Sequence, residues 1–327
     1  MLEVQSMKHL LIALFFSQLS FGAFAEPVVL GTVPLDKNVN VAHFIPENLN
    51  SVPEVFISRD EYLLSFNPER KLMNWAAWKI ELTDIGHVGR SNAFMPDSDL
   101  QAYLNQFNQK ALTPEDYHGT CFDKGHQVPS ADRDTTLEIN KVSFLMSNMI
   151  PQTAYLNRVI WEQLEQYTRN LVVKENKKVY IIAGPVFDED FGKIGPNNDI
   201  PIPSKDFKVV VVLDQNQSLD DINSDTQIIS VVMPNRLKTG EKPLDNKTEL
   251  CAESLNLNPP KPVPVPTPVP VTPEPIATSV SPTTPYPEPT AWMPYQVPLE
   301  DVEKLTGFKI RPPKASAPAN PAANIDQ

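Results

Sequence analysis

The chain has 327 residues, of which 28 are lysine or arginine and 40 are aspartate or glutamate, so its formal net charge is −12. This charge argues against a broad basic surface that would bind a polyanion through many phosphate contacts. An anionic ligand would have to be held locally, by a few cations or by a bound divalent metal ion. The length allows one large domain or two smaller ones.

The first 25 residues have the composition of a secretory signal peptide. The stretch from Leu10 to Phe24 is largely apolar, Lys8 precedes it, and Ala23-Phe24-Ala25 places small residues at the spacing of a cleavage site. A membrane anchor is the competing interpretation, but the apolar stretch is short for crossing a bilayer. We therefore expect cleavage after residue 25, no stable membrane insertion, and a secreted or periplasmic protein.

Residues 26–50 lack a clear periodicity and are expected to lead into the domain. Residues 61–67 and 74–82 are rich in apolar and aromatic side chains and are separated by a turn-like Pro-Glu-Arg-Lys segment, which predicts a pair of strands. Residues 97–109 are expected to contain a short helix.

A longer helix is predicted from Val159 to about Glu175. Four apolar residues recur there at helical intervals and would form one buried stripe: Ile160, Leu164, Tyr167 and Leu171. Trp161 is expected to pack in the same helix.

Three continuous apolar runs follow, in residues 179–186, 207–213 and 227–233, and valine and isoleucine predominate in them. Runs of this kind are typical of strands that are buried on both faces. The elements together predict a mixed α/β (α+β) protein with a central sheet.

The composition changes after Pro259, because 14 of the 36 residues from Pro259 to Pro294 are proline. Such a stretch favours an extended spacer over a packed element. Beyond it, Leu299, Val302 and Leu305 lie at helical spacing before Gly307, a residue that often ends a helix. We therefore interpret residues 241–292 as a Pro-rich inserted linker inside the domain, and residues 310–327 as a disordered C-terminal end.

The two cysteines, Cys121 and Cys251, could form one disulfide bond in an oxidising compartment. On a chain-entropy model, closing so long a loop would contribute roughly 4–5 kcal/mol. The alternative is two unpaired thiols that pack as small hydrophobic side chains.

The stretch from Asp123 to Arg133 combines the residue types that act on phosphates. It reads Asp-Lys-Gly-His-Gln-Val-Pro-Ser-Ala-Asp-Arg. The histidine, His126, can accept a proton near neutral pH. Lys124 supplies a cation for an anionic oxygen, and Gly125 permits a close approach to the histidine.

Two further motifs follow, Ser147-Asn148-Met149-Ile150-Pro151-Gln152 and Asn157-Arg158 with Trp161 and Glu165. In order and spacing the three motifs resemble those of the DNA/RNA non-specific endonucleases, which are ββα-metal (His-Me finger) nucleases. The one clear departure is Lys124, because arginine is commoner there in the family.

The resemblance covers roughly residues 50–240 and 293–309, and the latter segment looks like the family's closing helix. It implies an endonuclease domain over residues 51–240 plus 293–309, with a central mostly antiparallel sheet flanked by helices.

The resemblance also implies the roles of several residues. His126 would be the general base, and Asn157 would hold a single metal ion, with Mg²⁺ expected and Mn²⁺ as the alternative. Glu165 would hold a water bound to the metal. The competing interpretations are a solvated loop histidine, a helix cap for Asn157 just before the helix predicted at Val159, and a solvated glutamate.

Cationic and amide residues complete the expected site. Arg90 and Lys124 would contact the phosphate, although Arg90 could be only a surface cation, and Lys124 lacks the two-pronged donor group of arginine. Asn148 would orient its neighbours through hydrogen bonds, and Asp123 and Arg133 would be structural charges. A zinc site of Cys121, His118 and His126 has no supporting paired-cysteine spacing.

The expected function is a secreted, metal-dependent endonuclease with DNA and RNA as substrates and 5′-phosphate products, and a homodimer is left open. Two alternatives remain. One is a phosphodiesterase acting on small or lipid-derived substrates, which the acidic charge favours. The other is a non-catalytic binding protein that reuses the fold.

Overall fold

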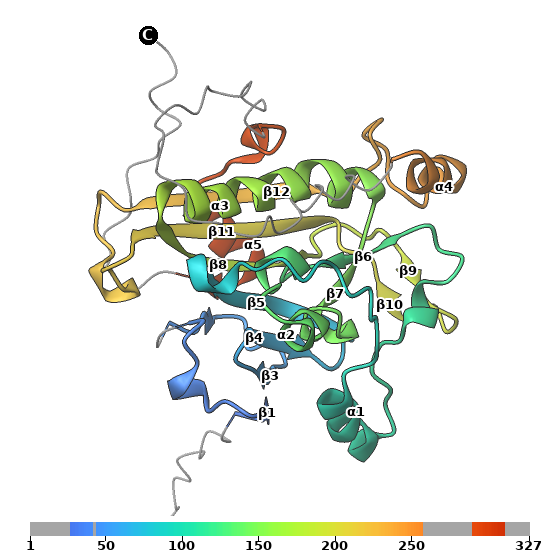
Figure 1. Cartoon of the computed structure of the whole chain (residues 1–327). Helices are drawn as coiled ribbons and strands as arrows, with labels where there is room; N and C mark the ends of the chain where they lie inside the picture. Colours follow the sequence, from blue (N-terminus) through green and yellow to red (C-terminus); the bar gives the residue numbers. More distant parts are fainter. Residues whose placement is uncertain (1–26, 42–43, 258–289, 311–327) are drawn as a thin grey trace, which may run out of the picture.

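A computed structural model describes residues 27–41, 44–257 and 290–310 (Figure 1). The predicted signal peptide lies outside the described residues. So do residues 258–289 of the predicted linker and residues 311–327 of the predicted C-terminal end.

The described residues form short and long strands and five α-helices. The strands are β1 (Val29–Gly31), β2 (Glu47–Asn48), β3 (Val55–Ser58), β4 (Leu63–Asn67), β5 (Leu72–Ile80), β6 (Asp123–His126), β7 (Met149–Gln152), β8 (Lys177–Val186), β9 (Lys193–Ile194), β10 (Ile200–Pro201), β11 (Lys205–Asp214), β12 (Gln227–Pro234) and β13 (Phe308–Lys309). The α-helices are α1 (Ser98–Leu104), α2 (Leu137–Val142), α3 (Glu162–Glu175), α4 (Lys247–Asn256) and α5 (Leu299–Thr306).

Seven of the strands form one central sheet in the order β1-β3-β4-β5-β8-β11-β12. Every neighbouring pair is antiparallel except β1 and β3, which run parallel. The expectation of a mixed α+β fold with a central, mostly antiparallel sheet is confirmed.

The continuous apolar runs are explained by the two covered faces of this sheet. On β11, Val210 and Val212 belong to the core cluster under α3, whereas Phe207 and Val209 belong to the cluster that also contains Val302 of α5. Figure 1 shows α3 in front of β8, β11 and β12, with α5 behind them. Because successive side chains of a strand point to opposite faces, a strand buried on both faces must be apolar at almost every position.

Most predicted elements lie close to their observed bounds, including the helix over residues 98–104 and the closing helix α5. That helix ends at Gly307, whose φ of +73° suits glycine, although Leu305 is exposed. In the segment expected to lead into the domain, β1 joins the central sheet and β2 pairs with β13. The range expected to be a linker includes the helix α4.

No helix within the described ranges is both long enough and apolar enough to cross a membrane.

Candidate active site

The hairpin of β6 and β7 places His126 opposite Met149 and Gly125 opposite Ile150. A Cβ atom on Gly125 would lie only 2.0 Å from Oε1 of Gln152. Glycine is therefore required at this position for the hairpin to close with Gln152 in place. With the helix that follows β7, the hairpin forms a strand-strand-helix unit beside the central sheet (Figure 1).

The imidazole of His126 is buried, with 7% of the residue exposed. Its ring lies edge-on to the rings of Phe144 and Phe94, at centroid distances of 4.8 and 5.7 Å. Burial lowers the pKa of His126 well below its usual value, and the positive charge of Arg90 lowers it further. A hydrogen bond with the backbone of Lys124 raises this pKa, but its effect is smaller. Its Nε2 has no hydrogen-bond partner in the described structure. The residue is thus a neutral imidazole with a free ring nitrogen, which can accept a proton.

Arg90 lies beside His126. Its guanidinium carbon is 4.9 Å from the centroid of the Phe144 ring, and its Nη1 donates a hydrogen bond of 3.2 Å to Oγ of Ser130. Partial burial lowers the pKa of Arg90, and the carboxylates of Glu165 and Asp123 oppose this change. The structure therefore brings together Arg90, the histidine and the two carboxylates.

Lys124 lies on the same side of the hairpin as His126. Its Nζ is 5.0 Å from the centroid of the Phe94 ring and 5.8 Å from that of the Tyr117 ring. Two aromatic faces thus stabilise the ammonium group without neutralising it. Phe94 contacts both this cation and the imidazole of His126, so the two groups share one wall.

Asn148 is fully buried and uses its whole amide on the backbone. Its Oδ1 accepts a hydrogen bond from the nitrogen of Val128, and its Nδ2 donates to the carbonyl oxygens of Val128 and Ser143. These bonds fix the chain two residues after His126. Asn148 therefore holds the backbone of this loop, and its part in a reaction stays a prediction.

Asn157 does not precede the long helix, and the expectation that the helix begins near Val159 is wrong. The nitrogen of Leu156 already bonds to Oγ1 of Thr153, and Leu156–Trp161 forms a π-helical segment that leads into α3. Asn157 is inside this wide turn and makes no helix cap. Pi-helical turns of this kind are frequent at functional sites.

The side chain of Asn157 is fixed by Asp123. Its Nδ2 donates a hydrogen bond of 2.9 Å to Oδ2 of Asp123, which leaves Oδ1 as the acceptor of this amide. Arg158 binds the same carboxylate through Nε and Nη2, at 2.8 and 2.6 Å. Asp123 is therefore a structural charge, as expected, and it locks the π-helical turn to β6.

Glu165 is one of the most strongly perturbed acids of the chain. Burial raises the pKa of its carboxyl group to about 7, although the positive charges of Lys208 and Arg169 lower it. The nearest cation is Lys208 of β11, with Nζ 3.8 Å from Oε1 of Glu165. The solvated-glutamate interpretation does not fit, because only 13% of this side chain is exposed.

Three charged residues near the site were missed by the sequence reasoning: Arg158, Arg169 and Lys208. Arg169 forms a 2.9 Å ion pair with Asp132. A signal was present in the sequence, because a lysine inside the apolar run of β11 is unexpected in a doubly buried strand. Arg133 is structural as predicted, and it donates to the carbonyl oxygens of Glu61 and Lys79.

The described residues fit a metal ion of the magnesium class better than zinc. No group of three or more histidine, cysteine, aspartate or glutamate side chains is placed to hold an ion within those ranges. The amide oxygen of Asn157 is a hard, neutral donor of the kind that Mg²⁺ accepts alongside several waters. Zinc is usually held by three or four histidine, cysteine or carboxylate side chains.

Cys121 is unavailable for zinc because it forms a disulfide with Cys251, with their Cα atoms 4.9 Å apart. The bond links the approach to β6 with α4. His87 and His118 are exposed.

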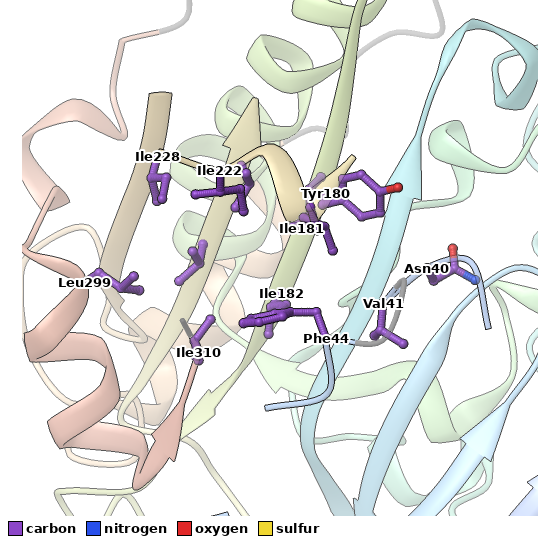
Figure 2. A pocket seen from close by; sticks show the side chains of 13 residues that line it. Asn40, Val41, Phe44, Tyr180, Ile181, Ile182, Ile222, Ile228, Leu299 and Ile310 are labelled. Carbon is purple, nitrogen blue, oxygen red and sulfur yellow. The ribbon is translucent and has the colours of Figure 1, made fainter. Parts of the chain in front are cut away.

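A small apolar pocket of about 30 Å³ lies on the α5 side of the sheet and not at this site (Figure 2). Phe44, Ile182, Leu299 and Ile310 line it together with neighbouring apolar side chains. With no titratable group other than Tyr180 in its wall, it offers no acid-base chemistry near neutral pH.

Comparison with known proteins agrees with this geometry. A sequence profile of the family described as DNA/RNA non-specific endonuclease matches residues 41–317. A nuclease of Nostoc sp. is 39% identical over 180 residues, which cover 54% of this chain and 62% of the relative. A nuclease of Serratia marcescens is 31% identical over 164 residues (48% and 59%), and human mitochondrial endonuclease G is 28% identical over 190 residues (54% and 59%).

The matched region thus spans about three fifths of the length of these curated relatives. A crystal structure of an EndoG/EndoGI complex contains a chain with the same fold, at a TM-score of 0.53 and 18% identity, covering 85% of this chain and 92% of that one. The family profile extends over most of the sequence and includes every residue of the site. The chain therefore belongs to the DNA/RNA non-specific endonuclease family.

Proposed function

We propose that the chain is a secreted, metal-dependent endonuclease that hydrolyses phosphodiester bonds in DNA and RNA and leaves 5′-phosphate ends. The observation that carries the proposal is the buried, neutral His126, whose free Nε2 lies in one site with Arg90. A base of this kind can take a proton from the attacking water, and such general base catalysis contributes about 10²- to 10⁴-fold to a rate.

The other residues act on the phosphate and its surroundings. Arg90 and Lys124 neutralise the phosphoryl oxygens on which charge develops in the transition state. Asn157 would hold the metal ion, with Mg²⁺ as the expected ion and Mn²⁺ as the alternative. When bound, the ion supplies positive charge to the phosphate and to the leaving oxygen. Glu165 would accept a hydrogen bond from a water of that ion and so orient it, while Asn148 and Asp123 hold the backbone and the amide in place.

Export from the cell is supported by two features of the chain. The first 25 residues have the pattern of a signal peptide, and Cys121 pairs with Cys251, which suits an oxidising compartment. N-terminal sequencing of protein recovered from the periplasm and the medium should find Glu26 as the first residue. Gel filtration of the same material tests the homodimer.

The decisive experiment compares wild type with His126→Ala on plasmid DNA and RNA, with Mg²⁺ or with a chelator. We expect wild type to nick both substrates only with the metal, and His126→Ala to lose about 10²- to 10⁴-fold in kcat with an unchanged circular dichroism spectrum. His87→Ala, which alters an exposed histidine, is the matched control. Full activity of His126→Ala would refute the assignment of the base.

One alternative has its own support. The net charge of −12 disfavours a long polyanion, so a small phosphodiester remains a candidate substrate. A simple aryl phosphodiester added to the same assay separates the two functions. Cleavage of this compound without cleavage of plasmid or RNA would favour the phosphodiesterase, and no metal-dependent cleavage of either would favour a binding protein.

A further inference from the structure

Lys208 is a lysine in the middle of β11, and only 1% of its side chain is exposed. It is paired in register with Ala183 of β8 and Val231 of β12, so it lies inside the sheet and not at an edge. Burying an ammonium group is costly unless a partner compensates. Its presence there calls for a reason other than packing.

The contacts of Lys208 direct its charge toward the active site. Nζ lies 3.9 Å from the centroid of the Trp161 ring and 5.8 Å from that of Trp78, which places the ammonium group over aromatic faces. Nζ is 3.8 Å from Oε1 of Glu165, beyond hydrogen-bond length, and it has no hydrogen-bond partner among the described residues. Trp161 itself ends the π-helical segment that carries Asn157.

The charged groups around Lys208 are Glu165, Asp132, Arg169 and Asp206. Two of the acids have other partners. Asp132 binds Arg169 and accepts a hydrogen bond of 2.9 Å from Nε1 of Trp78. Asp206 accepts a hydrogen bond from Nε2 of Gln152. Of these three acids, Glu165 is the one that forms an ion pair with Lys208, and it forms no other ion pair within the described ranges.

We propose that Lys208 is a positioning residue of the reaction, whose buried ammonium group keeps the carboxylate of Glu165 ionised and directed into the site. This inference rests on the proposed function of Glu165. Burial raises the pKa of Glu165 to about 7 even with the lysine present, and burial lowers that of Lys208 to about 8. Without the lysine, Glu165 would keep the positive charge of Arg169 but would remain buried near Asp132 and Glu162, so its pKa would rise further.

The test combines Lys208→Met, Lys208→Arg and Glu165→Gln with the double variant of Lys208→Met and Glu165→Gln. Methionine keeps the length and can still cover the tryptophan rings, but it removes one partner of a buried ion pair, which is destabilising. We expect Lys208→Met to fold with a lowered melting temperature and, at a temperature where it is fully folded, to lose about 10- to 100-fold in kcat, as is typical for groups that orient a metal site. Lys208→Arg should recover part of the loss.

The double variant separates positioning from packing. If Lys208 acts through Glu165, adding Lys208→Met to Glu165→Gln should change kcat by no more than about twofold. The acid limb of the kcat profile should also move up by about one pH unit or more in Lys208→Met. In metal-free protein, ¹³C NMR of the Glu165 carboxyl group should show a rise in pKa of similar size, independently of activity.

Lys178→Met is the matched control. Lys178 is a partly buried lysine of β8 that donates to the carbonyl oxygens of Gln215 and Gln217, and its replacement should leave kcat unchanged. If Lys208→Met does not fold, Lys208→Gln provides the same comparison.

Three results would overturn the role of Lys208 and leave the proposed nuclease in place. These are an unchanged kcat, an equal loss of kcat in the Glu165→Gln background, and an unchanged pKa of Glu165. A wild-type protein that cleaves no nucleic acid would instead overturn the proposed function, and this inference with it.

Discussion

The reactivity of His126 depends on what surrounds its ring. Phe94 and Phe144 exclude water from the imidazole. The positive charge of Arg90 disfavours a second positive charge on the protonated imidazole. Both effects lower the pKa, so the ring stays neutral in mildly acidic solution. A base that titrates below the working pH is weaker, but it is always in the form that accepts a proton.

This neutral state predicts how stability depends on pH. The unfolded chain protonates a histidine below about pH 6.5, whereas the folded protein does so only at a lower pH, so the unfolded state binds more protons between those values. The free energy of unfolding should therefore rise with pH in this window, by up to about 1.4 kcal/mol per unit from His126. In His126→Gln, the rise of this free energy across the window should be smaller than in wild type, as measured by urea unfolding in a chelator.

Glu165 acts in the opposite direction, since its raised pKa of about 7 makes the folded state bind more protons above about pH 4.5. That contribution is present in both proteins and cancels in the comparison. His87→Gln, at an exposed position, should leave the pH dependence unaltered. An equal pH dependence of wild type and His126→Gln would mean that the folded protein does not hold this histidine neutral.

The sequence is most informative about residues whose role shows in a local motif. His126, Arg90 and Asn157 were predicted in this way; in the structure Arg90 lies near the buried His126, and Asn157 donates a hydrogen bond to Asp123. Lys208 was not identified, because its role comes from β11 lying beneath Trp161 and Glu165, a contact between residues more than forty positions apart. In the sequence, the one sign of a function was the positive charge of Lys208 within the apolar run of residues 207–213.

At the scale of elements, α4 is linked to the hairpin of β6 and β7 in two ways. The disulfide joins Cys251 of α4 to Cys121, two residues before β6. Arg158 forms the second link, because it binds Asp123 and also donates to the carbonyl oxygens of Ser254 and Leu257 at the end of α4. The helix thus supports the strand that ends at His126.

Removing the disulfide should loosen α4 before the rest of the domain. In the double variant Cys121→Ser, Cys251→Ser we expect the free energy of unfolding to fall by up to about 4–5 kcal/mol, because the bond closes a loop with a sequence separation of 130. Amide exchange should increase most in residues 247–256, while kcat falls less, since Arg158 still holds Asp123. Hydrogen-exchange mass spectrometry and urea unfolding provide the two measurements.

Wild type that has been reduced and alkylated should behave as the double variant does, which controls for the serine side chains. Unchanged amide exchange in residues 247–256 would show that the disulfide does not hold α4.

The elements differ in how well their sequences predicted them. Strands β8, β11 and β12 were predicted nearly to their ends, because burial on both faces leaves an apolar run. Strands β6 and β7 were not, because residues chosen for chemistry and tight packing, such as Gly125 and Gln152, give no alternating pattern. The helix α4 is mostly polar, and its one local signal is the cap residue Asn246, whose side chain accepts a hydrogen bond from the nitrogen of Glu249.

At the scale of the whole molecule, the central sheet separates two packed faces. The site lies on the face that α3 covers, and the opposite face is closed by α5, which follows the proline-rich segment in the sequence. The proposal that this segment is an insertion means that the domain is completed only by the residues after it. Leu299 and Val302 of α5, with Phe308 of β13, belong to the core cluster of that face.

A chain that ends after Lys261 should therefore lose its fold and not merely a tail. Among the described residues, it would lack five buried hydrophobic side chains: Trp292, Leu299, Val302, Phe308 and Ile310. Each contributes about 1.5–3 kcal/mol by burial, so their loss is comparable with the total stability of about 5–15 kcal/mol typical of a domain. Thermal melting and circular dichroism of the truncated protein should show a strongly lowered or absent transition.

The matched control keeps α5 and changes only the spacer. Replacing residues 262–285 by a glycine- and serine-rich segment of equal length should leave melting and activity close to wild type, because a flexible linker of that length can join the same two points without altering the core. If the truncated chain melted like wild type, α5 would be dispensable and the domain would end before the proline-rich segment. If instead the spacer variant unfolded, the proline-rich sequence itself would contribute to the fold. The expected pair of results, a failed truncation and a tolerated replacement, arises only if the residues beyond the spacer complete the domain.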